Sequence, residues 1–298
     1  RIGFFAPQDE TKRYFTSNFT TALRVVDQKR FDPLFVSLFM QALYSSGATE
    51  TLQRATTGIR NLDWSEYLNF EIPEIPLEAQ RYIAVAIDRV RQSYLFEEDL
   101  LKLTLDLKRV AMRELFTHGL RGEEQKDSEI GPVPESWSVR RLGSLGKIGG
   151  GTTPNRSKAE FWDGGTIPWI TSGKMYEREI WSSEVHLTPH GLKTNNLPLL
   201  KPGALLIAIV GQGKTLGHCA ILRVEATISR HVGYFQPDET LTTSGYVRGY
   251  LESKYDYLRQ LASGNGSTRA ALTAAILRDV SVPVPPTVEE QVEITSIL

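Results

Sequence analysis

The sequence predicts an α+β protein in which two repeated domains, the first of them incomplete, are joined by one long helix. Three observations predict this class: a long-period internal repeat, an uninterrupted helical pattern of apolar residues, and short apolar runs of strand type in the second half. The chain has 298 residues, of which 41% are hydrophobic and 23% charged. This composition is ordinary for a globular protein with a core, and the length suggests about two domains.

The repeat is the first element of the prediction. A segment that begins at Leu62 aligns in order and residue type with one that begins at Leu272, 210 positions later. Each copy passes through a proline-rich bend and an acidic step that ends at Gln80 and at Gln291, with one extra residue in the second copy. Upstream, Phe35-Val36-x-x-Phe39 stands near the register of Tyr246-Val247-x-x-Tyr250. Because solenoid repeats are only about 20–50 residues long, this period predicts two whole domains.

The repeat also predicts the domain boundaries. We expect the C-terminal part of a first domain over 1–80, a central helix over 81–122, a second domain over 123–288 and the start of a second helix over 289–298. The first copy then lacks its opening portion, and the second copy lacks its portion beyond Gln291. The chain begins at Arg1 rather than Met and stops inside an apolar pattern, so both ends look cut.

The central helix is predicted by spacing and composition. Between Arg81 and His118 there is no Pro or Gly, while Gly119 and Gly122 supply a stop. Apolar residues step by three and four along one line, interrupted only by Glu98 and Lys108. So narrow a line over about 35 residues is typical of a coiled coil that needs a partner helix, and the alternative is a long helix lying across its own domain. We call these residues the helix seam: Ile83, Ile87, Val90, Tyr94, Leu101, Leu105, Met112 and Leu115.

The second domain reads as a mixture of strands, glycine-rich turns and helices. We expect strands over 167–170, 204–210, 218–224 and 227–235, with the second buried on both faces. A helix should run from Tyr246 toward Leu261, followed by a polar loop over 263–269 and a short helix. The run Gly149–Pro154 reads as a turn that needs positive φ or close backbone approach.

Several chemistries find no motif in the sequence. The turn Gly211–Thr215 (GQGKT) invites comparison with a phosphate-binding loop, but Ala208 stands where that motif requires its first glycine. No set of residues has metal-ligand spacing, because Pro189 separates His186 from His190 and no thiol or acidic partner is suitably spaced. Cys219, the one cysteine, reads as a small buried residue in a chain from a reducing compartment. We therefore predict no catalytic residue, no metal site and no membrane span.

Charge is distributed unevenly along the chain. Residues 137–236 hold twelve Lys and Arg against six Asp and Glu, a balance of +6, so a net charge of −1 leaves −7 for the rest. Many of these cations lie in or beside turns rich in Gly, Thr, Ser and Asn. Such turns suit phosphate contacts from Lys, hydroxyls and backbone amides, whereas Arg and Gln can read base edges. The plain alternative is a solvated surface with cations placed by chance.

Together these features resemble the DNA-specificity subunit of type I restriction–modification systems. The resemblance rests on the domain entry Gly131–Trp137 (GPVPESW), the run Gly149–Pro154 (GGGTTP), the exit Leu277–Pro286 (LRDVSVPVPP) and the long helix between copies. It implies two target-recognition domains that each read half of a split site on double-stranded DNA. It also implies antiparallel spacer helices that set the distance between the halves and dock DNA methyltransferase subunits, with restriction (motor-nuclease) subunits joining the complex.

The resemblance further implies a cytoplasmic, non-catalytic subunit, with S-adenosylmethionine, ATP and magnesium on its partners and no cofactor in this chain. The residues of the helix seam should face a partner helix. In the second domain we expect DNA contacts from polar residues of the basic turns, namely Thr152, Thr153, Lys174, Gln212, Lys214, Arg230, Ser267, Thr268 and Arg269. Gly150, Gly151 and Pro154 match the family pattern but read as turn architecture. Two other classes stay open: a nucleotide-binding enzyme built on the Gly211–Thr215 turn, and a coiled-coil scaffold for protein partners.

Overall fold

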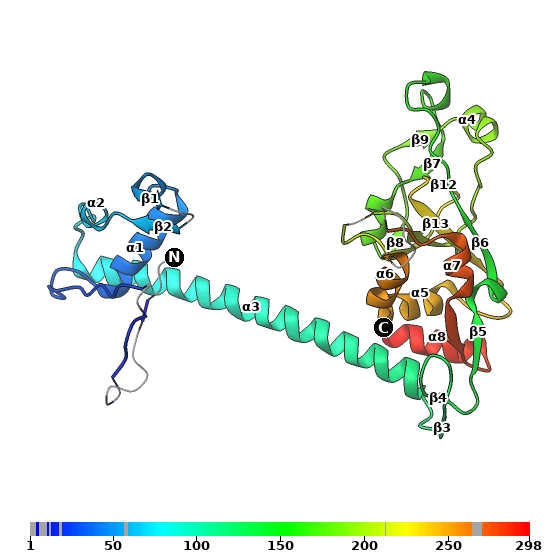
Figure 1. The fold of residues 1–298 in the computed structure, drawn as a ribbon, viewed down its shortest axis with the longest axis horizontal. Helices are drawn as coiled ribbons and strands as arrows, with labels where there is room; N and C mark the ends of the chain where they lie inside the picture. Colours follow the sequence, from blue (N-terminus) through cyan, green and yellow to red (C-terminus); the bar gives the residue numbers. More distant parts are fainter. Residues whose placement is uncertain are drawn as a thin grey trace. The chain divides into compact units, whose positions relative to one another are not determined.

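A computed structural model describes residues 4–5, 11, 13–17, 20–56, 59–211, 213–263 and 270–298. The chain divides into two compact units, Arg1–Leu103 and Thr104–Leu298, and each is described by itself. The division falls inside the long helix α3 (Leu77–His118). This helix is therefore shared, with its first part in one unit and its last turns in the other (Figure 1).

The first unit is small. Helix α1 (Pro33–Ser45) starts at the N-cap Asp32, whose carboxylate accepts the backbone N–H groups of Leu34 and Phe35. A 3₁₀ turn, η1 (Glu50–Leu52), precedes an antiparallel hairpin of β1 (Gln53–Thr56) and β2 (Ile59–Leu62). A short helix, α2 (Trp64–Tyr67), then leads through the proline bend into α3.

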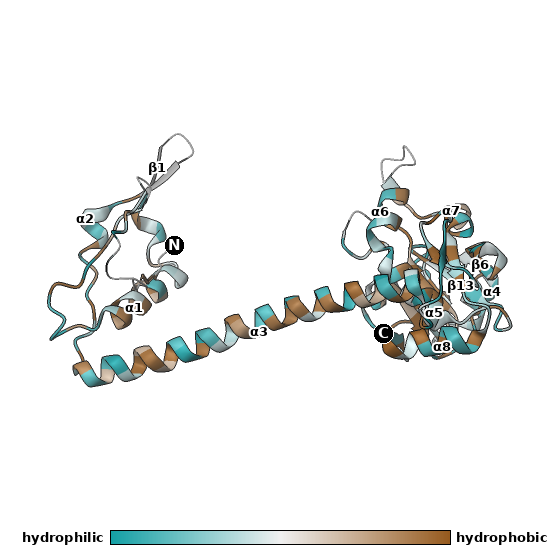
Figure 2. Cartoon of the chain, turned by 90° about the horizontal axis from the view of Figure 1, so that it is seen from below, coloured by the Kyte–Doolittle hydropathy of each residue, from teal (hydrophilic) through white to brown (hydrophobic). Residues whose placement is uncertain are grey.

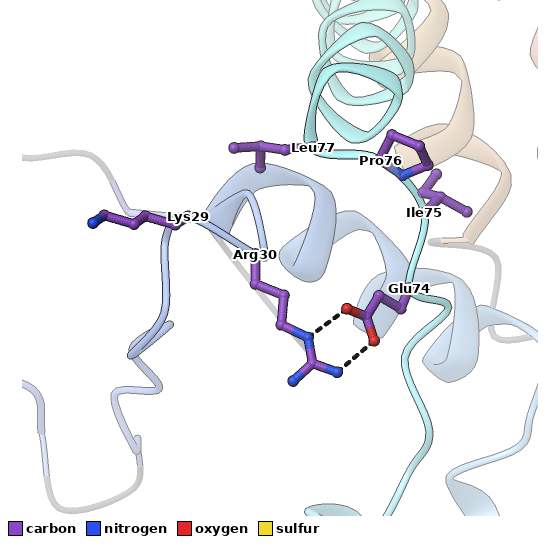
Figure 3. A pocket seen from close by; sticks show the side chains of 6 residues that line it. All are labelled: Lys29, Arg30, Glu74, Ile75, Pro76 and Leu77. Atoms are coloured by element: carbon purple, nitrogen blue, oxygen red, sulfur yellow. Dashed lines mark hydrogen bonds and ion pairs between the residues drawn. The ribbon is translucent and has the colours of Figure 1, made fainter.

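Gln80, in the first turn of α3, anchors this helix to the start of α1. Its side chain is fully buried, and its Oε1 accepts the backbone N–H of Asp32 at 2.9 Å. Its Nε2 donates to the carbonyls of Arg30 and Ile75, both at 2.8 Å. Arg30 also forms a bidentate ion pair with Glu74 across a shallow pocket at this bend (Figure 3). That pair is more than half exposed and adds little stability, so the buried amide is the main anchor.

The second unit is built on a mixed sheet of five strands in the order β6-β13-β10-β11-β8. Its strands are β6 (Gly146–Gly150), β13 (Val232–Pro237), β10 (Leu205–Ala208), β11 (Cys219–Leu222) and β8 (Glu179–Ile180). All neighbours are antiparallel except β11 and β8. The central strand β10 is buried along its whole length, as the apolar run over 204–210 predicts.

A second sheet has three strands, β12 (Thr227–Ile228), β7 (Ile167–Ile170) and β9 (His186–Leu187). The prediction of one strand over 227–235 is wrong, because the chain reverses at 229–231 and passes from this sheet to the larger one. The backbone N–H of Val232 donates to the carbonyl of Ser229 at 3.0 Å, which closes that turn. The three residues of the reversal, Ser229, Arg230 and His231, are all polar, and this interruption of the apolar pattern marks the break.

Two short strand pairs and several one-turn elements complete the sheet side of this unit. Strand β5 (Ser138–Arg141) pairs with β14 (Ser281–Val284), and β3 (Gln125–Lys126) pairs with β4 (Val133–Pro134). The one-turn elements, in chain order, are η2 (Leu142–Ser144), η3 (Ala159–Phe161), η4 (Ser172–Tyr176) and helix α4 (Pro189–Thr194).

Four helices at the C-terminal end of the chain pack on this framework. They are α5 (Ser244–Ser253), α6 (Tyr255–Ser263), α7 (Ala274–Asp279) and α8 (Val288–Ile297). The single helix predicted from Tyr246 to Leu261 is two helices, because the backbone leaves helical geometry at Lys254 (φ −103°, ψ 19°). Helices α5 and α8 lie side by side (Figure 1). This mixture of helices and strands confirms the predicted α+β class.

The last turns of α3 belong to the core of the second unit. Met112 and Phe116 are about 95% buried there, and the Phe116 ring lies 5.4 Å from the rings of Tyr246 and Tyr250. The prediction that Met112 and Leu115 face a partner helix is therefore wrong, since both pack in this chain's own domain. The helix then ends where predicted, at Gly119 and Gly122, whose φ values are +66° and +59°.

The remainder of the helix seam is exposed. Ile83, Ile87, Val90, Tyr94, Leu101 and Leu105 are between 37% and 71% exposed. Hydrophobic residues recur along the whole of α3 (Figure 2). Lys108, which interrupts the seam in the sequence, pairs with Glu252 of α5 at 2.5 Å. The seam thus changes role near Lys108, from a solvent-facing apolar line to a contact with the second unit.

Candidate nucleic-acid interface

The end of β6 and the turn between β12 and β13 bring two of the predicted DNA-contacting residues together. Thr153 Oγ1 accepts the backbone N–H of Arg230 at 3.3 Å, and Arg230 Nε donates to His231 Nε2 at 3.3 Å. A Cβ at Gly151 would lie 2.1 Å from the carbonyl oxygen of Ile228. Close backbone approach therefore explains this glycine, whereas positive φ does not occur at Gly149, Gly150 or Gly151. Thr152 and Arg230 are exposed beside this contact.

Lys174 lies in η4 and is already paired with two carboxylates. Its Nζ is 2.9 Å from Glu177 and 2.8 Å from Glu184, and the side chain is only 17% exposed. Hydrogen bonds with Glu184 and Glu177 raise the pKa of Lys174, and the hydrogen bond from Lys174 lowers the pKa of Glu184. A DNA phosphate would have to displace these carboxylates, so Lys174 is less available than its sequence context suggests.

Lys214 differs from Lys174. It is exposed in the turn after β10, and no carboxylate of the described residues lies within ion-pair distance of it. The turn leads into strand β11 rather than into a helix, so the helix N-terminus that a phosphate-binding loop uses is replaced by a strand. The carbonyls of Gly213, Lys214 and Leu216 all accept hydrogen bonds from side chains of α6. This geometry does not favour nucleotide binding at Gly211–Thr215.

Four of the predicted contact residues lie outside the described residues: Gln212, Ser267, Thr268 and Arg269. Their described neighbours nevertheless meet in the backbone. Gly211 N–H donates to the carbonyl of Ala270 at 3.4 Å, and Leu272 N–H donates to the carbonyl of Ile209 at 2.8 Å. The flanks of the two loops thus lie side by side at one end of β10.

Arg156 is an ordered cation that the sequence pattern did not single out as a site residue. Its guanidinium lies 4.2 Å from the ring centre of Trp162 and 4.4 Å from that of Trp169. Trp162 Nε1 donates to the carbonyl of Asn155 at 3.0 Å, which closes the loop that carries the arginine. The sequence signal that could have identified this residue is an Arg followed by two Trp within one turn-rich stretch. Cation–π contacts between such residues hold an exposed guanidinium in place.

Cys219 begins β11 and packs against the core, but it is partly rather than fully buried as predicted. Its Sγ lies 3.4 Å from the carbonyl oxygen of Gly217, and burial raises the pKa of the thiol to about 12. A thiol with so high a pKa is a poor nucleophile at neutral pH. Among the described residues, no group of three or more His, Cys, Asp or Glu is arranged to hold a metal ion. None of the described helices is long and apolar enough to span a membrane.

Relatives of known type share both sequence and architecture with this chain. The specificity subunit of the type I restriction enzyme MjaIX from Methanocaldococcus jannaschii is 29% identical over 180 residues, which are 59% of this chain and 40% of that subunit. The EcoR124I/EcoR124II specificity subunit from Escherichia coli is 30% identical over 162 residues, which are 53% of this chain and 39% of that subunit. The chain matches about two fifths of the length of these curated relatives.

Two solved structures share the fold. One belongs to a study of complex assembly and conformational transition of the type I R-M system, with a TM-score of 0.56 and 22% identity over 91% of this chain and 63% of that one. The other is the S subunit of a type I restriction-modification system from M. genitalium, with a TM-score of 0.57 and 15% identity over 91% of this chain and 66% of that one.

The family is shown by a match to most of the second unit. The family model described as the type I restriction modification DNA specificity domain covers residues 134–298, which is more than half of the chain. The match includes the five-stranded and the three-stranded sheet of the second unit. The chain therefore belongs to the type I restriction-modification DNA specificity domain family.

Proposed function

We propose that this chain is a sequence-reading part of a type I restriction–modification complex, and that its second domain contacts double-stranded DNA. The observation that carries the proposal is the family match over 134–298, because it covers the domain whose turns present unpaired or preordered cations. Lys214 and Arg230 supply the charge, and Thr152 and Thr153 supply hydroxyls beside Arg230. Such groups suit phosphate positioning and base-edge contacts in a groove.

We also propose that α3 is the spacer helix of the complex. Six seam residues stay exposed along it, and burial of such residues against a second helix is the expected source of association. The second copy of the repeat starts α8 at the position equivalent to the start of α3, so a helix from that copy is the expected partner. In this proposal DNA methyltransferase subunits dock on the helices, restriction subunits join them, and S-adenosylmethionine, ATP and magnesium are bound by those cytoplasmic partners rather than by this chain.

Selection from a randomised duplex pool tests this function directly. The subunit assembled with its methyltransferase subunits should enrich a split sequence with two half-sites at fixed spacing. The logarithm of its affinity for DNA should fall linearly with the logarithm of the salt concentration. Lys214→Ala should reduce that salt slope by about one. Lys174→Ala is the matched comparison and should reduce the slope less, because two carboxylates already neutralise its ammonium.

Two results would contradict the proposal. A complex that binds every duplex equally would remove sequence reading from this chain. Assembly with the methyltransferase subunits at all salt concentrations, without DNA binding, would favour the protein scaffold instead.

Leu101→Asp, on the exposed seam, should block helix pairing and leave the unfolding of each unit unchanged.

A further inference from the structure

The turn at Gly213–Gly217 is held in place by side chains from two other parts of the second unit. From α6, Arg259 Nη1 donates to the carbonyls of Gly213 and Leu216 at 2.7 and 3.4 Å, and the Tyr255 hydroxyl donates to the carbonyl of Lys214 at 2.5 Å. From η4, the Tyr176 hydroxyl is hydrogen-bonded to Thr215 Oγ1 at 2.9 Å. A surface turn of five residues thus has side-chain bonds to four of them.

Three aromatic rings are in contact beside this turn. The centre of the His218 ring lies 4.9 Å from that of Tyr176 and 4.9 Å from that of Tyr255, with the ring planes tilted by 46° and 51°. The Arg259 guanidinium lies over the Tyr255 ring at 5.5 Å. Burial lowers the pKa of His218, which favours the uncharged ring at neutral pH. These ring contacts help to orient Tyr176, Tyr255 and Arg259, which are the residues that hold the turn.

The carbonyls of the turn are satisfied by its own domain, while the side chain of Lys214 remains exposed and without a carboxylate among the described residues. This arrangement differs from Lys174, which is paired twice. A turn with a fixed backbone restricts the phosphates that the flexible Lys214 side chain can reach. A cation on a mobile turn can reach several phosphates and so contributes to binding on any sequence.

We propose that Tyr255 and Arg259 are positioning residues for DNA reading: they hold the Gly213–Gly217 turn so that Lys214 contacts one phosphate in register, and they determine discrimination between sequences rather than overall charge attraction. This inference rests on the proposed function. On this proposal, Tyr255 and Arg259 control how selectively the domain binds DNA. They do so without contacting DNA, and they lie more than forty positions along the chain from the turn that they hold.

The test compares four variants of the subunit assembled with its methyltransferase subunits, each measured on the selected site and on random duplex over a salt series. Tyr255→Phe combined with Arg259→Met removes the donors and keeps the ring. It should lower the ratio of specific to random affinity by about tenfold, the effect of one mismatched base pair, with the salt slope unchanged. Lys214→Ala should reduce the slope by about one on both duplexes. Tyr257→Phe, on the same helix and half exposed, is the control and should change neither quantity. Tyr255→Phe combined with Arg259→Lys, which retains a donor at position 259, should lose less discrimination than Tyr255→Phe combined with Arg259→Met.

The outcomes separate this inference from the function on which it rests. A wild-type complex without sequence preference would overturn the proposed function itself. A wild-type complex that discriminates, with a double variant that discriminates equally well, would overturn only the positioning role. Equal loss on both duplexes, or a fall in the melting temperature that Tyr257→Phe does not show, would assign the two residues to folding and also overturn it.

Discussion

In both copies of the repeat, a buried glutamine amide lies near the start of the helix that follows, α3 or α8. The side chains around this amide differ between the copies. In the second copy, Gln291 Oε1 accepts the backbone N–H of Thr243 and its Nε2 donates to the carbonyl of Leu241, at 3.2 and 3.0 Å. In the first copy, Gln80 makes the equivalent bonds with Asp32 and Arg30, 211 positions earlier in each case. The backbone partners of the two glutamines thus occupy equivalent positions in the two copies. In each copy one partner is the N-cap residue of a helix, Asp32 of α1 or Thr243 of α5.

The surroundings of the two anchor glutamines, Gln80 and Gln291, are not reproduced. Glu290, beside Gln291, accepts the indole N–H of the buried Trp137 at 3.1 Å and lies 3.5 Å from Arg121. The equivalent position in the first copy is Ala79. Likewise Gln291 receives an additional hydroxyl bond from Thr242 at 2.9 Å, where the first copy has Phe31. The backbone contacts of the anchor glutamine are thus common to both copies, whereas the second copy adds contacts with the buried residues Trp137 and Thr242.

The largest effect should come from removing the part of the core that α3 contributes to the second copy. Phe116→Ala leaves a cavity against Tyr246 and Tyr250 and should lower the free energy of unfolding of the second unit by about 3–5 kcal/mol. Leu105→Ala, at an exposed position of the same helix, is the control and should change it by less than about 0.5 kcal/mol. Denaturant unfolding followed by tryptophan fluorescence measures both. Equal effects would mean that the end of α3 is not part of this core.

An intermediate effect is expected at the anchor glutamines, and it tests the comparison most directly. Gln291→Leu leaves the buried Thr242 hydroxyl and a part-buried N–H and carbonyl without partners, and should cost about 2–4 kcal/mol in the second unit. Gln80→Leu should cost about 1–2 kcal/mol in the first unit, because it removes only part-buried bonds to backbone groups, which water can replace. Gln260→Leu, at an exposed position of α6, provides the baseline. Hydrogen exchange resolves the two units, and a larger cost at Gln80 would contradict the account.

The smallest effect should follow from making one residue of the second copy like the first. Tyr246 donates its hydroxyl to the carbonyl of Pro283 at 2.7 Å, whereas the equivalent residue of the first copy is Phe35. Tyr246→Phe should therefore cost about 1–2 kcal/mol, since a buried carbonyl loses its partner. Tyr257→Phe controls for the loss of a hydroxyl at a half-exposed site. No change in the midpoint of thermal unfolding would show that water reaches the carbonyl of Pro283.

Much of the fold could be predicted because local patterns specify it. The helix α3, its stop at Gly119, the strand β7 over 167–170 and the buried strand β10 are all indicated by apolar spacing and by residues with strong backbone preferences. The repeat was visible for the same reason, since Gln80 and Gln291 are embedded in matching proline bends. The prediction of one element was wrong at 229–231, where three polar residues form a turn between two strands, and at Lys254, where one helix ends and another begins.

The sequence predicted that the turns of the candidate interface carry cations. It did not predict which of these cations form ion pairs with carboxylates of the same chain. Lys174 and Lys214 look alike in the sequence, each directly after a Gly, yet Lys174 is held by Glu177 and Glu184. The same limit applies to Met112, which fits the apolar spacing of a partner-facing seam and instead lies in the hydrophobic core of the second unit. Spacing gives the face of a helix on which a residue lies, but not what covers that face.

By itself, the sequence determined the class of the fold, the long helix, the repeat and the segregation of positive charge into one domain. These are local or additive properties, set by backbone preferences, by apolar period and by counting. The tertiary structure alone decided which carboxylate neutralises which lysine, where α3 changes from an exposed seam to a core element, and that Tyr255 and Arg259 hold a turn more than forty positions away. Those outcomes depend on contacts between distant segments, whose energies no local pattern contains.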